Sequence, residues 1–449
     1  MALKGLDIFK LTPRTNCKEC GNPTCMAFAM KVAQGTVQIE QCPHMSADAL
    51  ATLSEAAAPP MHTVKIGAGE QEYSLGGETV LFRHDKTFVS KSLYAVSVKP
   101  DDADNTLEDM LKIDYERISE RMIVELVNVV YEGDETAFTE AVRKAADTGR
   151  TLVLEVSDPA AARAALEIAK DGKPVLNGAN ESNYEEMAKI ATEYDVALGV
   201  SAADLDALYD LVQAIEKTGN KNLLIDVGAA SIKDAFANTV QIRRAALADN
   251  DRSFGYPTIV NVEKLAPGDA NMQIALASLF TLKYGSIIIL NELSYAQALP
   301  LFGLRQNIFT DPQKPMTVEK GNYPLNGADE NAPCALTVDF ALTYFIISGE
   351  IERSGVPINL LIPDAGGYSV LTAWAAGKLS AGSISRFIKE DGIEEKIKSR
   401  TLMIPGKVAV LKGELEENLP GWKIVVAPNE AISLVKFLKE GDYNAQPAA

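Results

Sequence analysis

Short apolar runs alternate with longer amphipathic stretches from about residue 92 to residue 310. The runs are rich in Val, Ile and Leu and are apolar at consecutive positions, which is typical of strands covered on both faces of a parallel sheet. Eight such runs can be identified: residues 93–98, 123–130, 151–156, 174–178, 196–200, 222–227, 257–262 and 286–290. They predict a closed (β/α)₈ barrel of the TIM type. An open doubly wound sheet is the alternative that periodicity leaves open.

The stretches between the runs carry the residues that begin helices. Asp158 precedes "PAAARAALEIAKDGK", and Ser201 opens "SAADLDALYDLVQAIEKTGNK". Their side chains can accept hydrogen bonds from first-turn amides, so we expect both to be helix caps. Asp204 and Asp206 lie near the same helix start, where their charge suits the helix dipole.

The pattern changes after residues 311–330, a polar segment rich in Pro, Gly and Asn that predicts a domain linker. Beyond it we expect a helix over residues 336–355, strands over 357–367, 401–406, 407–413 and 423–428, and a last helix over 429–440. These elements predict a small Rossmann-like α/β domain over residues 331–449.

Two smaller regions precede the barrel. Residues 1–57 hold most of the cysteines and predict a small module, and the prolines of "AAAPPM" indicate the linker that leaves it. Residues 58–91 alternate around Gly76 and Gly77, which predicts a β-hairpin cap. The expected domains are therefore 1–57, 58–91, 92–310, the linker 311–330, and 331–449.

The formal net charge is −18, from 43 basic and 61 acidic residues. This balance argues against nucleic acid as a partner, because phosphate binding needs a basic surface. No apolar run approaches the ~20 residues of a membrane span, and the first residues lack the apolar core of a signal peptide. We therefore expect a cytoplasmic protein that does not bind membranes.

Four of the five cysteines lie close together, at Cys17, Cys20, Cys25 and Cys42. Three of them share one short loop, and the fourth is followed directly by proline, which is typical of a [4Fe–4S] cluster. A zinc site is the alternative, although structural zinc usually uses two separated Cys-x₂-Cys pairs. Buried free thiols and a thioredoxin-like dithiol explain the spacing less well. The fifth cysteine, Cys334, is expected to be a small core residue.

The histidines are few, and all three lie before residue 85: His44, His62 and His84. The barrel and the C-terminal domain therefore have no histidine for a Ser–His or Cys–His nucleophilic system or for a histidine-bound zinc. Polar residues follow three of the predicted barrel strands, where barrel enzymes place catalytic groups. They are Asp226, Asn261 and Asn291, and the same positions also suit purely structural residues.

Small residues dominate the loops of the C-terminal domain. Gly366 and Gly367 free the backbone directly after a predicted strand. The helix that follows has a face with little side-chain bulk, made of Thr372, Ala373, Ala375, Ala376 and Gly377. Such a face suits either a large flat ligand or tight packing against another element.

The chain resembles the large subunit of the corrinoid iron–sulfur protein of the reductive acetyl-CoA pathway. The resemblance covers the whole length and is carried by "NCKECGNPTC…CP", by the order of the domains and by "LTAWAAGK". It implies a methyl carrier in which a corrinoid cobalt, as Co(I), takes a methyl group from methyltetrahydrofolate and passes it to acetyl-CoA synthase. It also implies that a [4Fe–4S] cluster returns oxidised Co(II) to Co(I).

The same resemblance implies the ligands and the partners. Cys17, Cys20, Cys25 and Cys42 would bind the cluster, and the cobalt would have no histidine below it, because the Asp-x-His-x-x-Gly loop of other corrinoid domains is absent. Thr372 would lie beneath the ring. The expected partners are a small subunit, a methyltetrahydrofolate methyltransferase and CO dehydrogenase/acetyl-CoA synthase. The expected corrinoid contacts are Thr343, Ser348, Gly349, Gly366, Gly367, Thr372, Ala373, Trp374, Ala375, Ala376, Gly377, Pro405 and Gly406.

Two other functions fit parts of the sequence. One is a pterin-dependent methyltransferase whose own barrel binds the methyl donor through Asp226, Asn261 and Asn291. The other is an electron-transfer protein that uses the cluster alone, which leaves the barrel and the C-terminal domain without a role.

Overall fold

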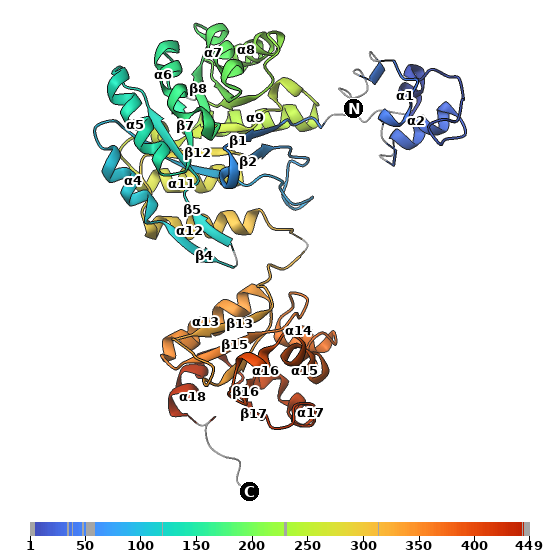
Figure 1. Cartoon of the computed structure of the whole chain (residues 1–449), viewed down its shortest axis with the longest axis vertical. Helices are drawn as coiled ribbons and strands as arrows, with labels where there is room; N and C mark the ends of the chain where they lie inside the picture. The colour runs from blue at the N-terminus through green and yellow to red at the C-terminus, as the bar shows by residue number, and fades with distance from the viewer. Residues whose placement is uncertain are drawn as a thin grey trace. The chain divides into compact units, whose positions relative to one another are not determined.

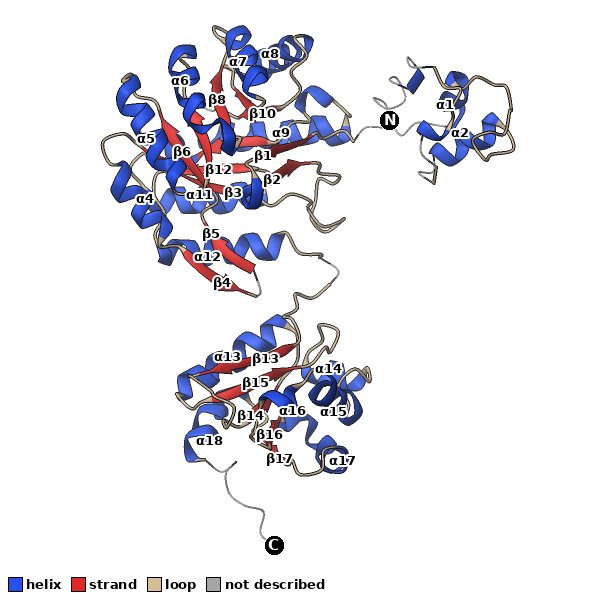
Figure 2. Ribbon diagram, viewed as in Figure 1, coloured by secondary structure: helices blue, strands red, loops and turns tan. Residues whose placement is uncertain are grey.

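The computed structural model describes residues 5–33, 36–37, 39–46, 49–50, 59–118, 120–228, 231–312, 314–441 and 443. Figures 1 and 2 show a helical N-terminal module, a barrel ringed by helices, and a C-terminal sheet with helices on both faces. The first half of the predicted linker "AAAPPM", residues 56–58, lies outside the described residues. No helix in the described ranges is long and apolar enough to cross a bilayer.

The N-terminal module is built on α1 (Gly5–Leu11), α2 (Cys25–Ala33) and the short 3₁₀ helix η1 (Ile39–Gln41). Its small core contains Ile8, Phe28, Ala29, Ile39, Cys42, Met45 and Ala49. Apolar side chains and one of the four clustered cysteines therefore share the interior of this module.

The predicted hairpin is present, but its turn lies elsewhere. Strands β1 (Thr63–Ile66) and β2 (Tyr73–Gly76) pair antiparallel, with the 3₁₀ helix η2 (Gly69–Gln71) between them. Gly76 therefore ends the second strand instead of forming the turn. The chain reverses at residues 67–72, where Gly67 and Gly69 both have positive φ angles.

A closed eight-stranded barrel confirms the main prediction. All of its strands are parallel and follow one another around the barrel in sequence order, and each corresponds to one predicted run. The strands are β3 (Leu93–Val98), β6 (Leu126–Val130), β7 (Thr151–Glu155), β8 (Val175–Ala179), β9 (Ala197–Val200), β10 (Leu223–Asp226), β11 (Thr258–Asn261) and β12 (Ile287–Leu290). The open-sheet alternative is therefore wrong.

Helices follow the barrel strands in the expected alternation. They are α4 (Ala103–Leu111), α5 (Glu135–Asp147), α6 (Pro159–Ala169), α7 (Tyr184–Tyr194), α8 (Leu205–Lys217), α9 (Ile232–Ala248), α10 (Val262–Leu265), α11 (Ala270–Leu282) and α12 (Tyr295–Ile308), with 3₁₀ turns η3 (Lys170–Gly172) and η4 (Arg252–Phe254). A further hairpin, β4 (Asp114–Arg117) with β5 (Glu120–Ile123), interrupts the alternation after α4.

The two predicted caps have different outcomes. Asp158 caps α6 by accepting hydrogen bonds from the amides of Ala160 and Ala161, as predicted. Ser201 does not cap α8, because the helix begins later and Asp204 accepts from the amide of Ala207 instead.

The C-terminal sheet has the strand order β13-β15-β14-β16-β17. Strand β13 (Gly321–Leu325) is antiparallel to β15 (Ile358–Ile362). The other strands, β14 (Cys334–Leu336), β16 (Thr401–Ile404) and β17 (Lys423–Val426), are parallel to β15. The parallel strands thus run in the order second, first, third, fourth. This is a doubly wound topology with its switch point between β14 and β16.

Helices cover both faces of this sheet (Figure 2), and the strand residues alternate between two cores. One core includes Leu336, Leu361 and Leu402, and the other includes Ala335, Leu360 and Met403. The helical elements are α13 (Ala341–Ser354), α14 (Val370–Ala375), α15 (Ala381–Glu390), α16 (Ile393–Lys396), η5 (Gly406–Leu411), α17 (Lys412–Asn418), η6 (Ala431–Ser433) and α18 (Leu434–Glu440).

Three details of the C-terminal prediction were wrong. The segment 311–330 includes β13, which is part of the sheet. The predicted helix over 336–355 begins only at Ala341, after the strand β14, which was not predicted. The segment 407–413 is helical, because Val408 and Leu411 are buried three positions apart while Val410 is 73% exposed. Cys334 lies in β14 and is fully buried, as predicted, and burial raises the pKa of its thiol to about 12.

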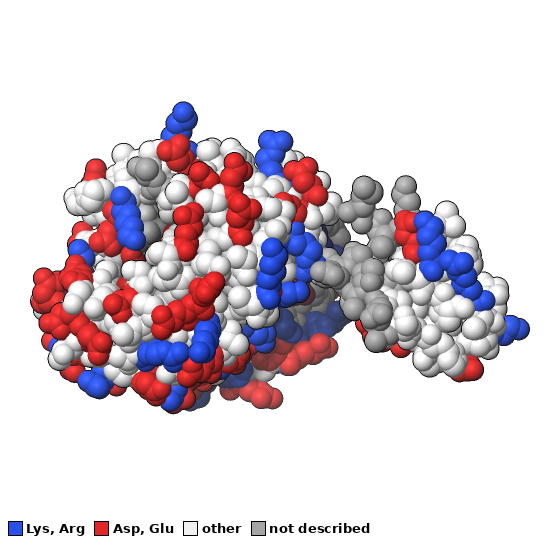
Figure 3. Space-filling model, turned by 90° about the horizontal axis from the view of Figure 1, so that it is seen from above, with Lys and Arg blue, Asp and Glu red and all other residues white. Residues whose placement is uncertain are grey.

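Charged side chains are mixed over the surface. On the face drawn in Figure 3, acidic side chains are spread widely with basic ones among them. No continuous basic surface is visible on that face, which agrees with the net charge of −18.

Candidate functional site

The first candidate site is the cysteine loop of the N-terminal module. Cys17 is exposed, Cys20 is half-buried, and Cys25 and Cys42 are buried. The loop is irregular, with positive φ angles at Arg14, Asn16, Lys18 and Gly21. Positive φ angles at residues other than glycine mark a tightly turned backbone.

Two asparagines hold this loop in shape. The side-chain oxygen of Asn16 accepts a hydrogen bond from the amide of Cys25, at 2.8 Å. The side-chain nitrogen of Asn22 donates to the carbonyl of Cys20, at 3.0 Å. The first of these bonds links the loop to the start of α2, so Cys25 is held by both the helix and the loop.

Three side chains of this module lie close enough together to hold one small ion. Within the described ranges, the one group of possible metal ligands that lie within 4.8 Å of one another is Cys17, Glu19 and His44. His44 Nε2 lies 2.7 Å from a Glu19 carboxylate oxygen. No three of the four clustered thiols form such a group in the described part of the chain.

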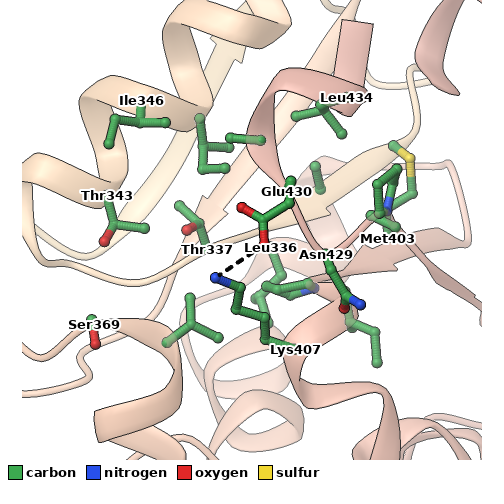
Figure 4. Close-up of a pocket in the computed structure, with 18 of the residues that line it drawn as sticks. Leu336, Thr337, Thr343, Ile346, Ser369, Met403, Lys407, Asn429, Glu430 and Leu434 are labelled. Atoms are coloured by element: carbon green, nitrogen blue, oxygen red, sulfur yellow. Dashed lines mark ion pairs between the residues drawn. The ribbon is translucent and has the colours of Figure 1, made fainter. Parts of the chain in front are cut away.

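The second candidate site is a cavity of about 340 Å³ at the carboxyl edge of the C-terminal sheet. Its wall includes the ends of β14 and β16, which meet at the switch point, where doubly wound sheets bind ligands. Figure 4 shows side chains from separate elements converging on it. The residues that line it include Leu336, Thr337, Thr343, Ile346, Ser369, Leu371, Met403, Pro405, Lys407, Asn429, Glu430 and Leu434.

The cavity is mostly apolar with a few polar groups. Lys407 Nζ lies 3.7 Å from a carboxylate oxygen of Glu430, the pair marked by the dashed line in Figure 4. Thr337, Thr343 and Ser369 add hydroxyl groups, and Asn429 adds an amide. A pocket of this kind holds a ligand by its apolar surface and orients it by few polar contacts.

The structure brings some of the predicted corrinoid contacts to this cavity and leaves others away from it. Thr343 and Pro405 line the cavity. Thr372, Trp374, Ala375, Ala376 and Gly377 are exposed on or beside α14, and Ala373 is buried in the core beneath them. Ser348 is also buried, and its hydroxyl lies 3.4 Å from the carbonyl of Phe345. Gly349 is partly exposed on the same helix.

Three of the predicted glycines have a clear steric reason. A Cβ on Gly406 would lie 2.5 Å from the carbonyl oxygen of Ala427. Gly366 and Gly367 have φ angles of 71° and 74°, and a Cβ on Gly367 would also meet Thr317. The backbone at these positions therefore needs glycine whether or not a ligand is bound.

A buried carboxylate fixes the loop before α14. The amide of Gly367 donates to both carboxylate oxygens of Asp339, each at 3.1 Å. Asp339 is 5% exposed, and this burial raises the pKa of its carboxyl group. The backbone of Asp339 also accepts from Val318, so the same residue joins the loop to the segment that precedes the sheet.

The sequence prediction missed several cavity residues. Lys407, Asn429 and Glu430 come from two segments that follow different strands, and Ile346 lies on α13. The rule that doubly wound sheets bind ligands at their switch point could have located these residues, but applying it requires the strand order. That order could not be derived because β14 was not predicted as a strand.

The three polar residues predicted at the ends of barrel strands do not all lie at one cavity. Asp226 and Asn261 line a cavity at the carboxyl ends of the barrel strands. Asn291 is exposed and does not line that cavity. Its backbone amide donates to the side-chain oxygen of Gln273.

Fold and sites together define a barrel protein with a thiol-rich N-terminal module and a doubly wound C-terminal domain open at its switch point. A family model described as CO dehydrogenase/acetyl-CoA synthase delta subunit matches residues 63–438, and one described as putative Fe-S cluster matches residues 13–44.

The chain is 39% identical to the corrinoid/iron–sulfur protein large subunit of Moorella thermoacetica, over 98% of this chain and 99% of that protein. It is 32% identical to the acetyl-CoA decarbonylase/synthase complex subunit gamma of Methanothermobacter thermautotrophicus, again over 98% and 99%. The chain belongs to this family of corrinoid/iron–sulfur protein large subunits and gamma subunits, which confirms the resemblance drawn from the sequence.

A comparison with solved structures found dihydropteroate synthase from Thermus thermophilus. It is 14% identical, with a TM-score of 0.39, and the match covers 56% of this chain and 100% of that one. The barrel assignment rests on the strand pairing described above and not on this likeness.

Proposed function

We propose that the chain carries methyl groups on a corrinoid held by its C-terminal domain, and that the N-terminal module holds a [4Fe–4S] cluster. The cobalt would take a methyl group from methyltetrahydrofolate on a separate methyltransferase and give it to acetyl-CoA synthase, with the cluster supplying the electron that reactivates oxidised cobalt. Membership of the family supports the general role.

The observation that carries the proposal is the cavity at the switch point, together with the apolar surface beside it. A cavity of about 340 Å³ is near the lower limit for ligand pockets, so a corrinoid would extend beyond it. Large apolar side chains stay exposed on α13 and on the loop and helix that begin at Tyr368. They are Leu342, Ile346, Tyr368, Leu371 and Trp374. A flat ligand on this surface would remove apolar area from water.

The chain's own residues would hold the corrinoid without binding its cobalt. No histidine occurs after His84, so the C-terminal domain cannot supply an imidazole below the metal. Thr372 is exposed at α14, next to Leu371 of the cavity wall, and we propose it as the residue beneath the ring. Because its hydroxyl group would not bind the cobalt, Thr372 would leave the low oxidation state of the metal accessible.

The four clustered cysteines are proposed as the cluster ligands. The spacing Cys-x₂-Cys-x₄-Cys-x₁₆-Cys, with Pro43 directly after Cys42, and the family model described as putative Fe-S cluster support a cubane more than a single zinc ion. We propose the same domain boundaries as the sequence analysis, with β13 counted as part of the C-terminal domain. A small subunit would cover the open side of the corrinoid, forming a heterodimer.

Metal analysis of the anaerobically purified chain tests this proposal. We expect about four iron atoms and one cobalt atom per chain, with the absorption bands of both an iron–sulfur cluster and a corrinoid. Zinc without cobalt would contradict the carrier proposal, and iron without cobalt would favour the electron-transfer function. Methyl transfer from methyltetrahydrofolate to free cobalamin by this chain alone would favour a methyltransferase.

A further inference from the structure

Helix α14 begins differently from the next helix of the same domain. Ser369 is the N-cap residue of α14, but its side chain accepts no hydrogen bond from a first-turn amide. Ser380, the N-cap residue of α15, accepts from the amide of Ser383 and forms a capping box with it. An N-cap serine normally binds such an amide, because this satisfies a donor that the helix itself leaves unpaired. The hydroxyl group of Ser369 is therefore used for something other than ordinary capping.

The hydroxyl group of Ser369 is bonded to a second hydroxyl group. Its oxygen lies 3.0 Å from Oγ1 of Thr372, three positions along the chain, and either group can be the donor. Neither hydroxyl group has another hydrogen-bond partner in the part of the chain that the structure describes. Threonine is branched at Cβ and has few χ1 rotamers, so one hydrogen bond is enough to select among them. Ser369 therefore fixes the direction of the Thr372 hydroxyl group.

The backbone that carries this pair is held on both sides of Ser369. Before it, the buried amide of Gly367 donates to both carboxylate oxygens of Asp339. After it, the amide of Ala373 donates to the carbonyl oxygen of Ser369, at 2.8 Å. Ser369 thus lies on fixed backbone, and its hydroxyl group passes that order on to Thr372.

The pair lies at the wall of the cavity at the switch point. Ser369, Val370 and Leu371 line this cavity, and Figure 4 labels Ser369 on its wall. Thr372 follows directly and is exposed. A ligand that extends beyond the cavity over α14 would therefore meet a threonine whose hydroxyl group is already bonded to its own helix.

We infer, resting on the proposed function, that Ser369 is a positioning residue for the face of the corrinoid that lies over Thr372. By keeping the Thr372 hydroxyl group bonded to its own helix, Ser369 leaves that group with fewer lone pairs and donors for the cobalt or for a water molecule beside it. An axial ligand stabilises Co(II) more than Co(I), because Co(I) already has two electrons in its axial orbital. Ser369 therefore makes the reduction of Co(II) easier without contacting the metal.

The variant Ser369→Ala in the full-length, corrinoid-loaded chain tests this inference. The variant releases the Thr372 hydroxyl group, so we expect a larger share of Co(II) with an axial ligand, measured by electron paramagnetic resonance. The reduction of Co(II) to Co(I) should become about two- to tenfold less favourable, which is the range of one neutral hydrogen bond. For one electron, a tenfold change is a shift of about 59 mV to more negative potential, which a spectroelectrochemical titration measures.

Three further variants show whether Ser369 acts through Thr372. Ser369→Thr keeps the hydroxyl group and should behave like the wild type. In a Thr372→Val background, Ser369→Ala should cause no further shift, because the bonded partner is already gone. Ser354→Ala is the matched control: it removes a serine hydroxyl that bonds to Ile351 and Val356 at the end of α13 and does not line the cavity. It should change neither the resonance spectrum nor the potential.

A measurement without corrinoid covers the case in which Ser369→Ala releases the cofactor. Nuclear magnetic resonance of the cobalt-free chain with labelled threonine methyl groups reports the χ1 rotamer of Thr372. We expect one dominant rotamer in the wild type and averaging over several in Ser369→Ala. An unchanged single rotamer in the variant would show that the bond to Ser369 does not fix Thr372, and the inference would be wrong.

Four results with the cobalt-loaded chain also overturn the inference. They are a wild-type spectrum and potential in Ser369→Ala, the same shift in the Thr372→Val background, an equal shift in Ser369→Thr, and an equal shift in Ser354→Ala. A wild-type chain without cobalt is a different result, because it contradicts the proposed function itself and with it the role of Ser369. Metal analysis distinguishes that case from the other four.

Discussion

Asp339 shows how one buried side chain can fix a ligand-binding loop. Its carboxylate accepts the amide of Gly367 with both oxygens, and its position at the carboxyl edge of the sheet is remote from solvent. We predicted Gly367 as a site residue because a glycine pair after a strand is visible in the sequence. Asp339 was not predicted, because the sequence does not show that an acidic side chain accepts from a backbone amide 28 positions away.

We therefore expect Asp339→Ala to destabilise the C-terminal domain by about 1–3 kcal/mol, since the amide of Gly367 would be buried without a partner. Asp339→Asn keeps one acceptor oxygen and should cost clearly less. Thermal unfolding of both variants beside the wild type measures the difference. Equal losses for Ala and Asn would show that the hydrogen bond to Gly367 contributes little.

The pH dependence of the same pair gives a second readout. Burial raises the pKa of Asp339 in the folded chain above its unfolded value, so the folded state binds the proton more tightly. The contribution of Asp339 to stability should therefore fall as pH rises from below the ordinary Asp pKa to above the raised one, and then level off. Asp339→Asn lacks this contribution, so the stability difference between wild type and variant should change with pH in that window and nowhere above it.

At the scale of elements, the sequence predicted what local patterns encode. All eight barrel strands were predictable because each is a continuous apolar run between amphipathic stretches. The segment 407–413 was mistaken for a strand, because alternation over so few residues does not distinguish a strand from one helical turn. Strand β14 has three residues, too few to be recognised as a strand from the sequence.

Helix α8 provides a test of how precisely a cap can be located. Asp204→Ala should destabilise the chain by about 1 kcal/mol, because Asp204 accepts from the amide of Ala207 at 2.9 Å. Ser201→Ala is the matched control at the position that the sequence favoured, and it should change stability by less than about 0.5 kcal/mol. Denaturant unfolding measures both, and a larger loss for Ser201→Ala would place the cap where the sequence prediction did.

At the scale of the whole molecule, the two candidate sites differ in how visible they are in sequence. The cysteine module is encoded by spacing within 26 residues, from Cys17 to Cys42, so residue spacing alone indicates a metal or iron–sulfur site there. The C-terminal cavity is formed by residues from Ala335 to Leu434 that meet only through the strand order. Without that order, composition could indicate small-residue loops but not which of them share a cavity.

The two sites lie in parts of the chain with separate hydrophobic cores, so we expect that the two proposed cofactors can be lost separately. The module has its own core, which includes Cys42, and the C-terminal sheet has two cores of its own. Cys42→Ala should therefore remove most of the iron and abolish reductive reactivation, while cobalt stays near one atom per chain.

Cys334→Ala is the matched control, since it removes a thiol from the core of the C-terminal sheet, and it should leave the iron content unchanged. Metal analysis and electron paramagnetic resonance of both variants provide the measurement. Loss of iron and cobalt together in Cys42→Ala would show that the module is needed to hold the corrinoid, and the separation argued from the independent cores would be wrong.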